Sequence, residues 1–563
     1  MSNESPYLRP TPSSDREATR LRLLVEAPDG LTSTELALRQ FVQERLGLDA
    51  RGMDWRVDRL FQPVRDEVDD ELTRFFEVTG AIVVSPTYPV HKLAFDLARR
   101  LSDTGPFTVD PDLPSSAFGY VLQDPASPTG LPVEAAEGPR ALADTSSRFW
   151  ALDDIRARAA WAVPPKPGGA ARGAGIRIGH PDTGYSLHPE LEVGALDLAL
   201  DRDVVDNDDD ARDPLQKRWW FPLDTPGHGT HTGSVIAGRS TGQITGVAPE
   251  ASLVPIRTIK SVVQVFDGDV AKAVHHAHQV GCQVISMSLG GIGFIGLQAA
   301  IVSAVQDGVI VLGAAGNDVG FVVAPAIYPE CIGVGASTAD GQPWSRSSHG
   351  PAVDICAPGE SVWAASVNSD VTPPVFGVGQ NHNGTSYGTA HVAGVAALWL
   401  AHHGYGMLVN TYGGDRVQAV FVELLKSVGH RRPTGWDTGQ YGVGVVDAER
   451  LLSASLPAPA AVAQLQPGWI SPAERFRSVV PELSPDEATQ RAVEISGVGD
   501  AQVEGWLNRF GRELVYLLTE DRQLRREFVD GAVTAREVSP SRGLRMRVAR
   551  VASLSLADGM TGS

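Results

Sequence analysis

The sequence predicts an α/β protein in which a mostly parallel sheet flanked by helices lies between a small α+β domain and a small helical domain. Its 563 residues suffice for three or four domains of about 150 residues each. Between about residues 146 and 455, short apolar segments alternate with helical patterns, as in a parallel sheet covered on both faces. Segments rich in proline and alanine separate this central domain from both ends of the chain.

The first 114 residues carry the order strand, helix, strand, strand, helix, strand. Strands are expected at residues 20–27, 55–64, 72–84 and 107–113, and helices at residues 33–47 and 90–102. This is the order of the split βαβ, or ferredoxin-like, arrangement, which hosts many functions and therefore decides none. Residues 115–145 combine Pro, Gly, Ala and Asp with weak periodicity, which predicts a linker.

The central domain, residues 146–455, contains the apolar strands of the predicted parallel sheet. Strands are expected at residues 175–180, 252–259, 282–289, 309–316 and 331–337, with helices at residues 269–279 and 297–308. Ligands of such sheets bind at the carboxyl ends of the strands, so we expect the functional residues there.

The C-terminal region begins with a Pro/Ala linker at residues 456–470 and continues as a helical domain at residues 471–563. Apolar residues keep helical spacing at Val503, Leu507, Phe510, Leu514, Leu517, Leu524 and Phe528, and weak alternation favours a short strand at residues 544–548. These residues contain no catalytic cluster, so we expect this domain to bind a regulatory protein.

Charge and composition limit the partners and the compartment. With 48 Lys and Arg against 67 Asp and Glu, the net charge of −19 argues against nucleic acid and anionic membrane as partners. The longest apolar stretch, residues 392–401, is about half of what a bilayer requires. The sequence starts without an apolar signal segment, and its three cysteines lie inside apolar runs. We therefore expect a cytoplasmic protein with reduced thiols.

Three motifs of the central domain supply the parts of a nucleophilic hydrolase. HPDTGY places Asp182 at the end of a strand, where a carboxylate can orient an imidazole. In GHGTHTGSVIAG, His228 opens a helix and can act as a general base. In NGTSYGTAH, Ser386 precedes a buried helix, where backbone N–H groups are free to stabilise an oxyanion.

Each motif has another interpretation when taken alone. Asp-Thr-Gly is a common turn, and Thr-Ser at a helix start is often an N-cap. His228 and His231 lie three residues apart and, with a nearby acid, could bind a metal ion. Taken together, the ordered set Asp182, His228 and Ser386 favours nucleophilic catalysis.

Five motifs in order resemble those of the subtilisin-like serine proteases. They are DTG around Asp182, HGTH from His228, SLGG from Ser288, AAGN ending at Asn317 and GTS ending at Ser386. The resemblance covers roughly residues 150–455. It implies a subtilisin-like fold for this domain and an endopeptidase that cleaves protein or peptide substrates without a cofactor for the chemistry.

The resemblance also implies a role for each motif residue. Ser386 would attack the peptide carbonyl, His228 would carry its proton, and Asp182 would hold the imidazole. Asn317 and the Ser386 N–H would bind the oxyanion. Ser288, Leu289 and Gly290 would pair with the substrate backbone as an added β-strand.

Two departures from the family pattern follow the nucleophile. Gly388 and Ala390 stand where the family usually has Ala and Pro, which puts the rigidity of the nucleophile turn in doubt. A non-catalytic protein-binding sensor on a protease scaffold is therefore the alternative function. Many relatives carry a split βαβ pro-domain, and the order of elements in residues 1–114 resembles it, which implies that this domain restrains the protease.

Residues 201–213 form an acidic run between the Asp182 and His228 motifs. Alternating carboxylates can enclose calcium, so a structural calcium site is one interpretation. A solvated surface loop is the expected one, because the run lacks a complete ligand pattern.

Overall fold

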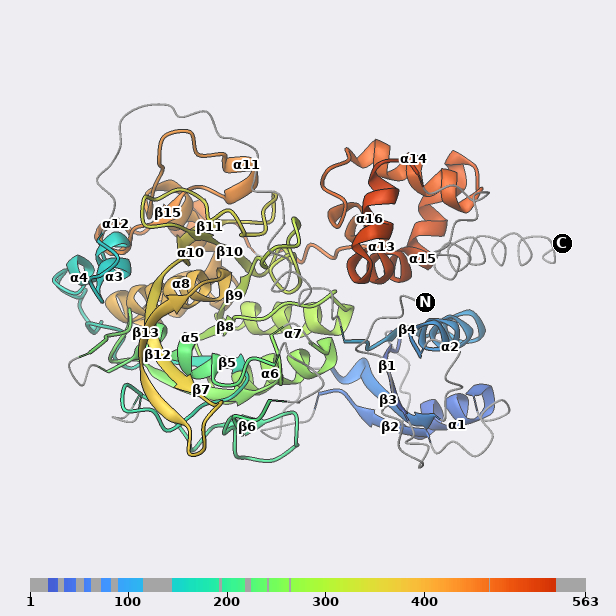
Figure 1. Ribbon diagram of the computed structural model, residues 1–563, viewed down its shortest axis with the longest axis horizontal. Helices are drawn as coiled ribbons and strands as arrows, with labels where there is room; N and C mark the ends of the chain where they lie inside the picture. The colour runs from blue at the N-terminus through green and yellow to red at the C-terminus, as the bar shows by residue number, and fades with distance from the viewer. Residues whose placement is uncertain are drawn as a thin grey trace.

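The computed structural model describes residues 19–28, 35–46, 55–61, 72–82, 90–114, 144–191, 195–217, 224–239, 243–262, 265–464 and 466–532. Figure 1 shows a large central part, residues 144–455, beside a small N-terminal part and a cluster of C-terminal helices. The predicted fold class, a mostly parallel sheet between an α+β part and helices, is confirmed.

The central part is built on a nine-stranded sheet in the order β14-β15-β11-β10-β9-β8-β5-β7-β6. Its strands are β5 (Arg177–Asp182), β6 (Arg202–Asp203), β7 (Ser252–Arg257), β8 (Val284–Met287), β9 (Ile310–Ala314), β10 (Ile332–Ser337), β11 (Ile355–Pro358), β14 (His430–Arg431) and β15 (Val445–Val446). All neighbours pair in parallel except β14 and β15. The expected strands are present, although β7 ends at Arg257 and β8 at Met287, each two residues earlier than expected.

Helices cover both faces of this sheet. The main ones are α5 (His228–Ala237), α6 (Asp267–Gln279), α7 (Ile295–Gln306), α8 (Thr385–His403), α9 (Tyr405–Tyr412) and α10 (Gly414–Ser427), and shorter ones are α3 (Trp150–Asp154), α4 (Ala157–Ala160), α11 (Thr438–Tyr441) and α12 (Ala448–Ser453). Val284 packs in the cluster with α8, whereas its neighbour Ile285 packs in the cluster with α6 and α7. Successive side chains of a strand thus enter opposite cores, which explains the continuous apolar runs.

Among the described residues, no single helix has the length and apolar character required to cross a membrane. The pair α8 and α9 meets these criteria together but bends by 79° between the two helices. Every residue of α8 is buried, as expected for the core helix of the central part.

The N-terminal part is an antiparallel sheet in the order β2-β3-β1-β4 with two helices. Its elements are β1 (Thr19–Glu26), α1 (Glu35–Leu46), β2 (Trp55–Arg59), a 3₁₀ turn (Leu72–Arg74), β3 (Phe75–Ile82), α2 (Val90–Thr104) and β4 (Thr108–Pro111). This is the ferredoxin-like arrangement that the order of elements predicted. The predicted linker lies mostly outside the described residues, as residues 115–143 are not among them.

The C-terminal helices are α13 (Pro472–Ser478), α14 (Pro485–Ser496), α15 (Asp500–Glu520) and α16 (Arg522–Val529). Ser471 and Ser484 begin α13 and α14 with capping boxes to Glu474 and Glu487. The apolar residues with helical spacing all become buried within α15 and α16. The strand expected at residues 544–548 lies outside the described residues.

A two-stranded hairpin of β12 (Val362–Asn368) and β13 (Val375–His382) adds to the central part beside α5. Its two strands pair only with each other. Elsewhere in the chain, a 3₁₀ turn (Pro459–Ala461) follows α12. The sequence patterns did not reveal this hairpin.

Candidate active site

The end of β5 brings the carboxylate of Asp182 against the imidazole of His228 at the start of α5. The Nδ1 of His228 lies 2.8 Å and 3.0 Å from the two carboxylate oxygens. Asp182 also accepts hydrogen bonds from the Thr183 N–H at 2.7 Å and the Thr232 hydroxyl at 3.3 Å. Asp182 is fully buried, so these contacts replace water around the carboxylate.

These contacts decide the charge of Asp182. Burial alone would raise the pKa of its carboxyl, but the attraction and hydrogen bond of His228 and the Thr183 N–H hold that pKa below its ordinary value. His180 lies behind the pair, with its Nε2 3.0 Å from the Thr232 hydroxyl. Burial lowers the pKa of His180, which keeps this second imidazole neutral beside the carboxylate. The Asp182 charge is therefore available to His228.

Glycines allow α5 to begin so close to the end of β5. Gly227, the residue before the helix, has φ 83°, and its N–H donates to Asp213 at 2.6 Å. At Gly229, a Cβ atom would lie 2.1 Å from the carbonyl oxygen of Gly184. Any side chain there would push His228 away from Asp182.

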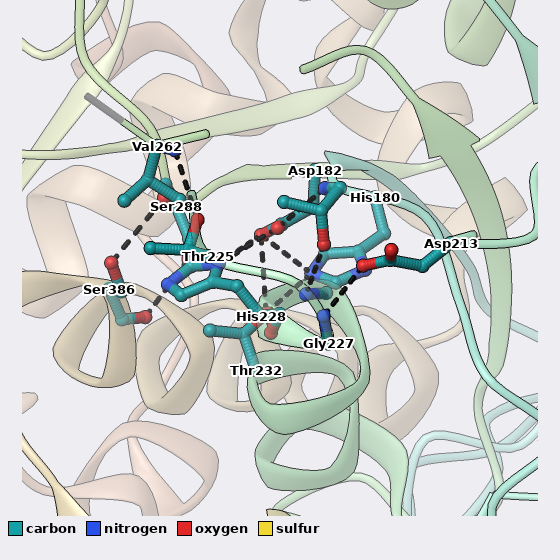
Figure 2. A network of polar contacts seen from close by, with 12 residues as sticks. His180, Asp182, Asp213, Thr225, Gly227, His228, Thr232, Val262, Ser288 and Ser386 are labelled. Atoms are coloured by element: carbon teal, nitrogen blue, oxygen red, sulfur yellow. Dashed lines mark hydrogen bonds and ion pairs between the residues drawn. The ribbon is translucent and has the colours of Figure 1, made fainter. Parts of the chain in front are cut away.

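Ser386 is the second residue of α8 and lies on the side of the His228 ring opposite to Asp182, as Figure 2 shows. Its Oγ donates to the carbonyl oxygen of Ser288 at 3.4 Å, and the Ser288 hydroxyl donates to the carbonyl oxygen of Ser386 at 3.0 Å. Ser386 is 7% exposed. Its position in the first helical turn leaves its backbone N–H without an intrahelical acceptor.

The side chain of Asn317 is oriented by Thr385, the residue before Ser386. The Oδ1 of Asn317 accepts the Thr385 N–H at 2.9 Å and the Thr385 hydroxyl at 3.0 Å. Because the Asn317 oxygen already accepts from Thr385, the amide nitrogen is the atom of this side chain that can donate to a bound substrate. Gly384 leaves room in front of it, since a Cβ there would lie 3.3 Å from that nitrogen.

Ser288, Leu289 and Gly290 follow β8 directly, at the same edge of the sheet as Asp182 and Asn317. The structure therefore brings all the predicted site residues together at the carboxyl ends of β5, β8 and β9 and the start of two helices.

The nucleophile turn is tightly packed despite its departures from the family pattern. A Cβ at Gly388 would lie 2.6 Å from the carbonyl oxygen of Gly335, so only glycine fits there. Ala390 is completely buried in the core with α8. The packing of these two residues gives no sign of the loosened turn that the sequence suggested.

Sequence reasoning missed the threonines that support the site. Thr232 lies one helical turn after His228, a spacing visible in HGTHT that would have placed both on one face of α5. Thr385 stands next to the predicted nucleophile, but only the fold shows its contact with Asn317.

The metal interpretations find no support in the described part of the chain, which contains no group of three or more His, Cys, Asp or Glu suited to a metal ion. The Nε2 of His231 accepts the Val367 N–H at 3.3 Å, away from Asp182. In the acidic run, Asp203 and Asp206 both bind Arg257. These carboxylates pair with an arginine instead of forming a ligand shell, so they do not fit the alternative of a calcium site.

A buried carboxylate, an imidazole and a helix-start hydroxyl in this order can activate the hydroxyl for attack on a carbonyl. Beside them lies an amide donor that can stabilise the resulting oxyanion. The fold and the site thus define a nucleophilic hydrolase.

The sequences of known proteases agree with this assignment. The model of the Subtilase family matches residues 173–436. Thermitase of Thermoactinomyces vulgaris is 35% identical over 268 residues, which are 46% of this chain and 84% of thermitase. Subtilisin E of Bacillus subtilis strain 168 is 33% identical over 244 residues, 41% of this chain and 57% of that protein. A solved protease from Pseudoalteromonas arctica PAMC 21717 is similar with a TM-score of 0.45 and 24% identity, over 54% of this chain and 96% of its own.

The chain belongs to the subtilase family and is a subtilisin-like serine endopeptidase. Its substrates are accordingly proteins or peptides, and subtilisins need no cofactor for catalysis.

Proposed function

We propose that Asp182, His228 and Ser386 form the catalytic triad of this endopeptidase. The observation that carries the proposal is the pairing of the His228 Nδ1 with Asp182 at 2.8 Å, with Ser386 on the other side of the ring. This pairing leaves the Nε2 of His228 as the nitrogen that faces Ser386. We expect the Ser386 hydroxyl to turn from the Ser288 carbonyl oxygen to this nitrogen when bound substrate excludes water from the site.

In the proposed reaction, the Oγ of Ser386 attacks the peptide carbonyl while its proton moves to the Nε2 of His228. The imidazolium is stabilised by Asp182, which keeps its own negative charge. The proton then passes to the leaving amine as the C–N bond breaks, and the acyl-enzyme remains. Water, activated by His228, hydrolyses that ester and returns Ser386 to its hydroxyl form.

Asn317 is proposed as the side-chain donor to the tetrahedral oxyanion, together with the Ser386 N–H. Thr385 supports this role because it holds the Asn317 oxygen and thereby directs the amide nitrogen outward. A donor that is oriented before the reaction costs no reorganisation when the charge develops.

Ser288, Leu289 and Gly290 are proposed to bind the substrate backbone as an added strand. They continue β8 beyond its last pairing residue, Met287, and end next to the nucleophile through the Ser288 contacts with Ser386. The pairing of an extended peptide with this segment would place its carbonyl at the Ser386 hydroxyl.

The test of the triad compares two buried serines. Ser386→Ala should abolish hydrolysis of a peptide anilide, whereas Ser303→Ala, in α7 and 5% exposed, should retain the wild-type rate. Circular dichroism would verify that both variants are folded. Hydrolysis that persists in Ser386→Ala would assign the nucleophile to another residue.

We further propose that the N-terminal part restrains the protease. It docks on α6 through a network centred on Arg22, whose guanidinium nitrogens donate to Asp269 at 2.8 Å and 2.7 Å. The same side chain lies 3.0 Å from Asp112 and 2.7 Å from Glu77, while Lys272 of α6 reaches Glu77 at 2.9 Å. These charges join β1, β3 and the end of β4 to one helix of the central part.

Apolar contacts accompany this network. Leu24, Leu60 and Phe75 share a core cluster with α6 and α7, and the Phe61 ring packs at a tilt against His275 with centroids 5.2 Å apart. After β4, the Asp112 carboxylate lies 3.5 Å from the Gly268 N–H at the start of α6. The end of β4 therefore lies beside the start of α6, where Asp267 accepts the Gly293 N–H of the loop after the proposed substrate-binding residues.

A cleavable full-length chain tests the restraint. A site for a sequence-specific protease would replace residues 124–130, and peptide hydrolysis would be measured before cutting and after cutting with removal of the N-terminal fragment. We expect activity to rise on removal and to fall again when the purified fragment is added back. Equal activity in all three samples would exclude restraint by this part.

Location and partner remain proposals as well. Cytoplasmic residence is supported by Cys282, Cys331 and Cys356, which are all free and buried. Cell fractionation would test it, and recovery of the protein outside the cytoplasm would contradict it. Binding of a regulatory protein to the C-terminal helices stays a prediction of the sequence.

A further inference from the structure

The C-terminal helices share a hydrophobic core with one loop of the central part. Phe321 and Val323 belong to the cluster whose other main members are Phe476, Leu507, Phe510 and Leu514 of α13 and α15. The guanidinium of Arg525 from α16 lies over the Phe321 ring, 5.3 Å from its centroid. Helices α13, α15 and α16 therefore pack on the outer side of this loop, residues 321–323. These helices come after all the site motifs in the chain.

Val323 of this loop lies between the two segments proposed to hold the substrate. A Cβ at Gly290 would lie 2.4 Å from one methyl group of Val323, and a Cβ at Gly316 would lie 3.0 Å from the other. Gly290 ends the substrate-binding segment, and Gly316 directly precedes Asn317. Val323 therefore packs closely against both segments.

Backbone hydrogen bonds couple the loop to the same two segments. The Val323 N–H donates to Ala315 at 3.0 Å. Gly291 and Ala324 exchange bonds of 2.8 Å and 3.1 Å. The loop is thus a structural link between the substrate-binding segment and the oxyanion segment.

Arg475 of α13 binds both sides of this link. Its Nε donates to the carbonyl oxygen of Ile292 at 2.7 Å, and its Nη1 donates to the carbonyl oxygen of Val322 at 3.2 Å. The same Nη1 is 3.0 Å from the Ser478 hydroxyl. One rigid planar group therefore fixes the spacing between the two backbone segments.

The position of Arg475 is energetically demanding, because it is only 6% exposed. Burial lowers its pKa to about 10, while the nearby carboxylate of Asp267 provides a compensating attraction. Asp267 accepts the Gly293 N–H at 3.1 Å, and burial raises its pKa to about 7. Residues 292 and 293 are thus held between a buried cation and a buried acid. An apolar side chain could fill the space without the desolvation cost, so the hydrogen bonds account for the arginine.

We propose that Arg475 is a positioning residue for substrate binding, through which the C-terminal helices hold residues 288–293 at a fixed spacing from the loop at residues 321–323. The proposal rests on the proposed function, because it assumes that Ser288, Leu289 and Gly290 bind the substrate backbone. Arg475 acts through these segments and has no role in bond cleavage.

If Arg475 has this role, its loss should affect the hydrolysis of extended peptides more than that of small esters. An extended peptide needs the full length of the substrate-binding segment, whereas a small ester needs only the nucleophile and the oxyanion donor. Loss of the two Arg475 bonds should raise KM for a tetrapeptide anilide about tenfold and change kcat less than about threefold. KM and kcat for a single-residue ester should change less than about threefold.

The experiment uses the full-length chain with the inserted cleavage site, cut before assay, in four versions. Wild type is compared with Arg475→Met, which keeps the length but removes the donors, and with Arg475→Lys, which keeps the charge but loses the fork. The matched control is Arg477→Met, on the same helix, where the arginine contacts Thr489 and Glu504 within the C-terminal helices. Each version is assayed with the tetrapeptide anilide, the ester and a thermal unfolding scan.

We expect a raised KM for the tetrapeptide in Arg475→Met, a smaller rise in Arg475→Lys and wild-type values in Arg477→Met. An unchanged KM in both Arg475 variants would overturn the proposal, as would equal losses on peptide and ester. If Arg475→Met does not fold, Arg475→Lys decides by the same comparison. If wild type hydrolyses neither substrate and Ser386 fails to react with a fluorophosphonate, the proposed function fails and this inference fails with it.

Discussion

The two halves of the site differ in where their supports come from. The hydrogen bonds to the Asp182 carboxylate come from residues close in the chain, Thr183, His228 and Thr232. The substrate-binding half is supported by a loop whose outer face packs against α13 and α15, more than 140 residues further along the chain. The catalytic pair is therefore supported within the central part, whereas the position of the substrate-binding segment depends on a neighbouring part of the chain.

Asp182→Asn should have the largest effect, because it perturbs the half that is supported from within. The amide would favour the wrong tautomer of His228 and leave its imidazolium without a charge partner. We expect kcat to fall about 10⁴-fold with little change in KM, measured on the cut full-length enzyme. A loss confined to KM would mean that this half also serves binding.

Asn317→Ala should have an intermediate effect, because it removes one of the two proposed hydrogen-bond donors to the oxyanion and leaves the triad in place. For the subtilisin family itself, loss of the oxyanion donor is known to lower kcat by about 10²- to 10³-fold. We expect the same range here, with KM nearly constant. Asn317→Asp is the informative control, because it retains the contact size but places a negative charge at the oxyanion. Activity close to wild type in Asn317→Ala would remove Asn317 from the proposed mechanism.

The smallest effect concerns the N-terminal part, whose attachment should depend on pH. Burial raises the pKa of the Asp112 carboxyl to about 6, above the ordinary value of about 4 that it regains on release. Because the docked state has the higher pKa, it binds the proton more tightly. Docking is therefore strongest at low pH and weakens as pH rises through about 6.

After cutting, the N-terminal fragment should dissociate about tenfold faster at pH 7.5 than at pH 5. Surface plasmon resonance with an immobilised fragment would measure this rate. In Asp112→Asn, which resembles the protonated form, the dependence on pH should be reduced. Faster release at pH 5 in the wild type would show the opposite sign and reject this interpretation.

Local motifs in the sequence pointed to site residues in both halves, including Ser288, Leu289 and Gly290. Asp182 ends a strand, and His228 and Ser386 lie at helix starts. Asn317 follows a strand by three residues, so element boundaries place all four at one edge of the sheet. The steric need for Gly388 could not be read from the sequence, because it arises from Gly335 on β10, a contact made only in the fold.

The role of Arg475 could not be predicted from the sequence, because its partners are also brought close only by the fold. It lies in the segment PAERFRS, whose mixed charges are typical of a solvated helix face. Arg477, two residues further, does have its charge near the surface, and nothing local distinguishes the two. Only the docking of α13 against residues 292 and 322 gives Arg475 its partners.

Covalent labelling shows whether Ser386 is the nucleophile of an Asp-His-Ser triad. The cut full-length enzyme would be treated with a fluorophosphonate, digested and analysed by mass spectrometry to locate the adduct. We expect a single adduct on Ser386, formed in the wild type and lost when His228 is replaced by alanine. An adduct on another residue, or no adduct after removal of the N-terminal fragment, would contradict it.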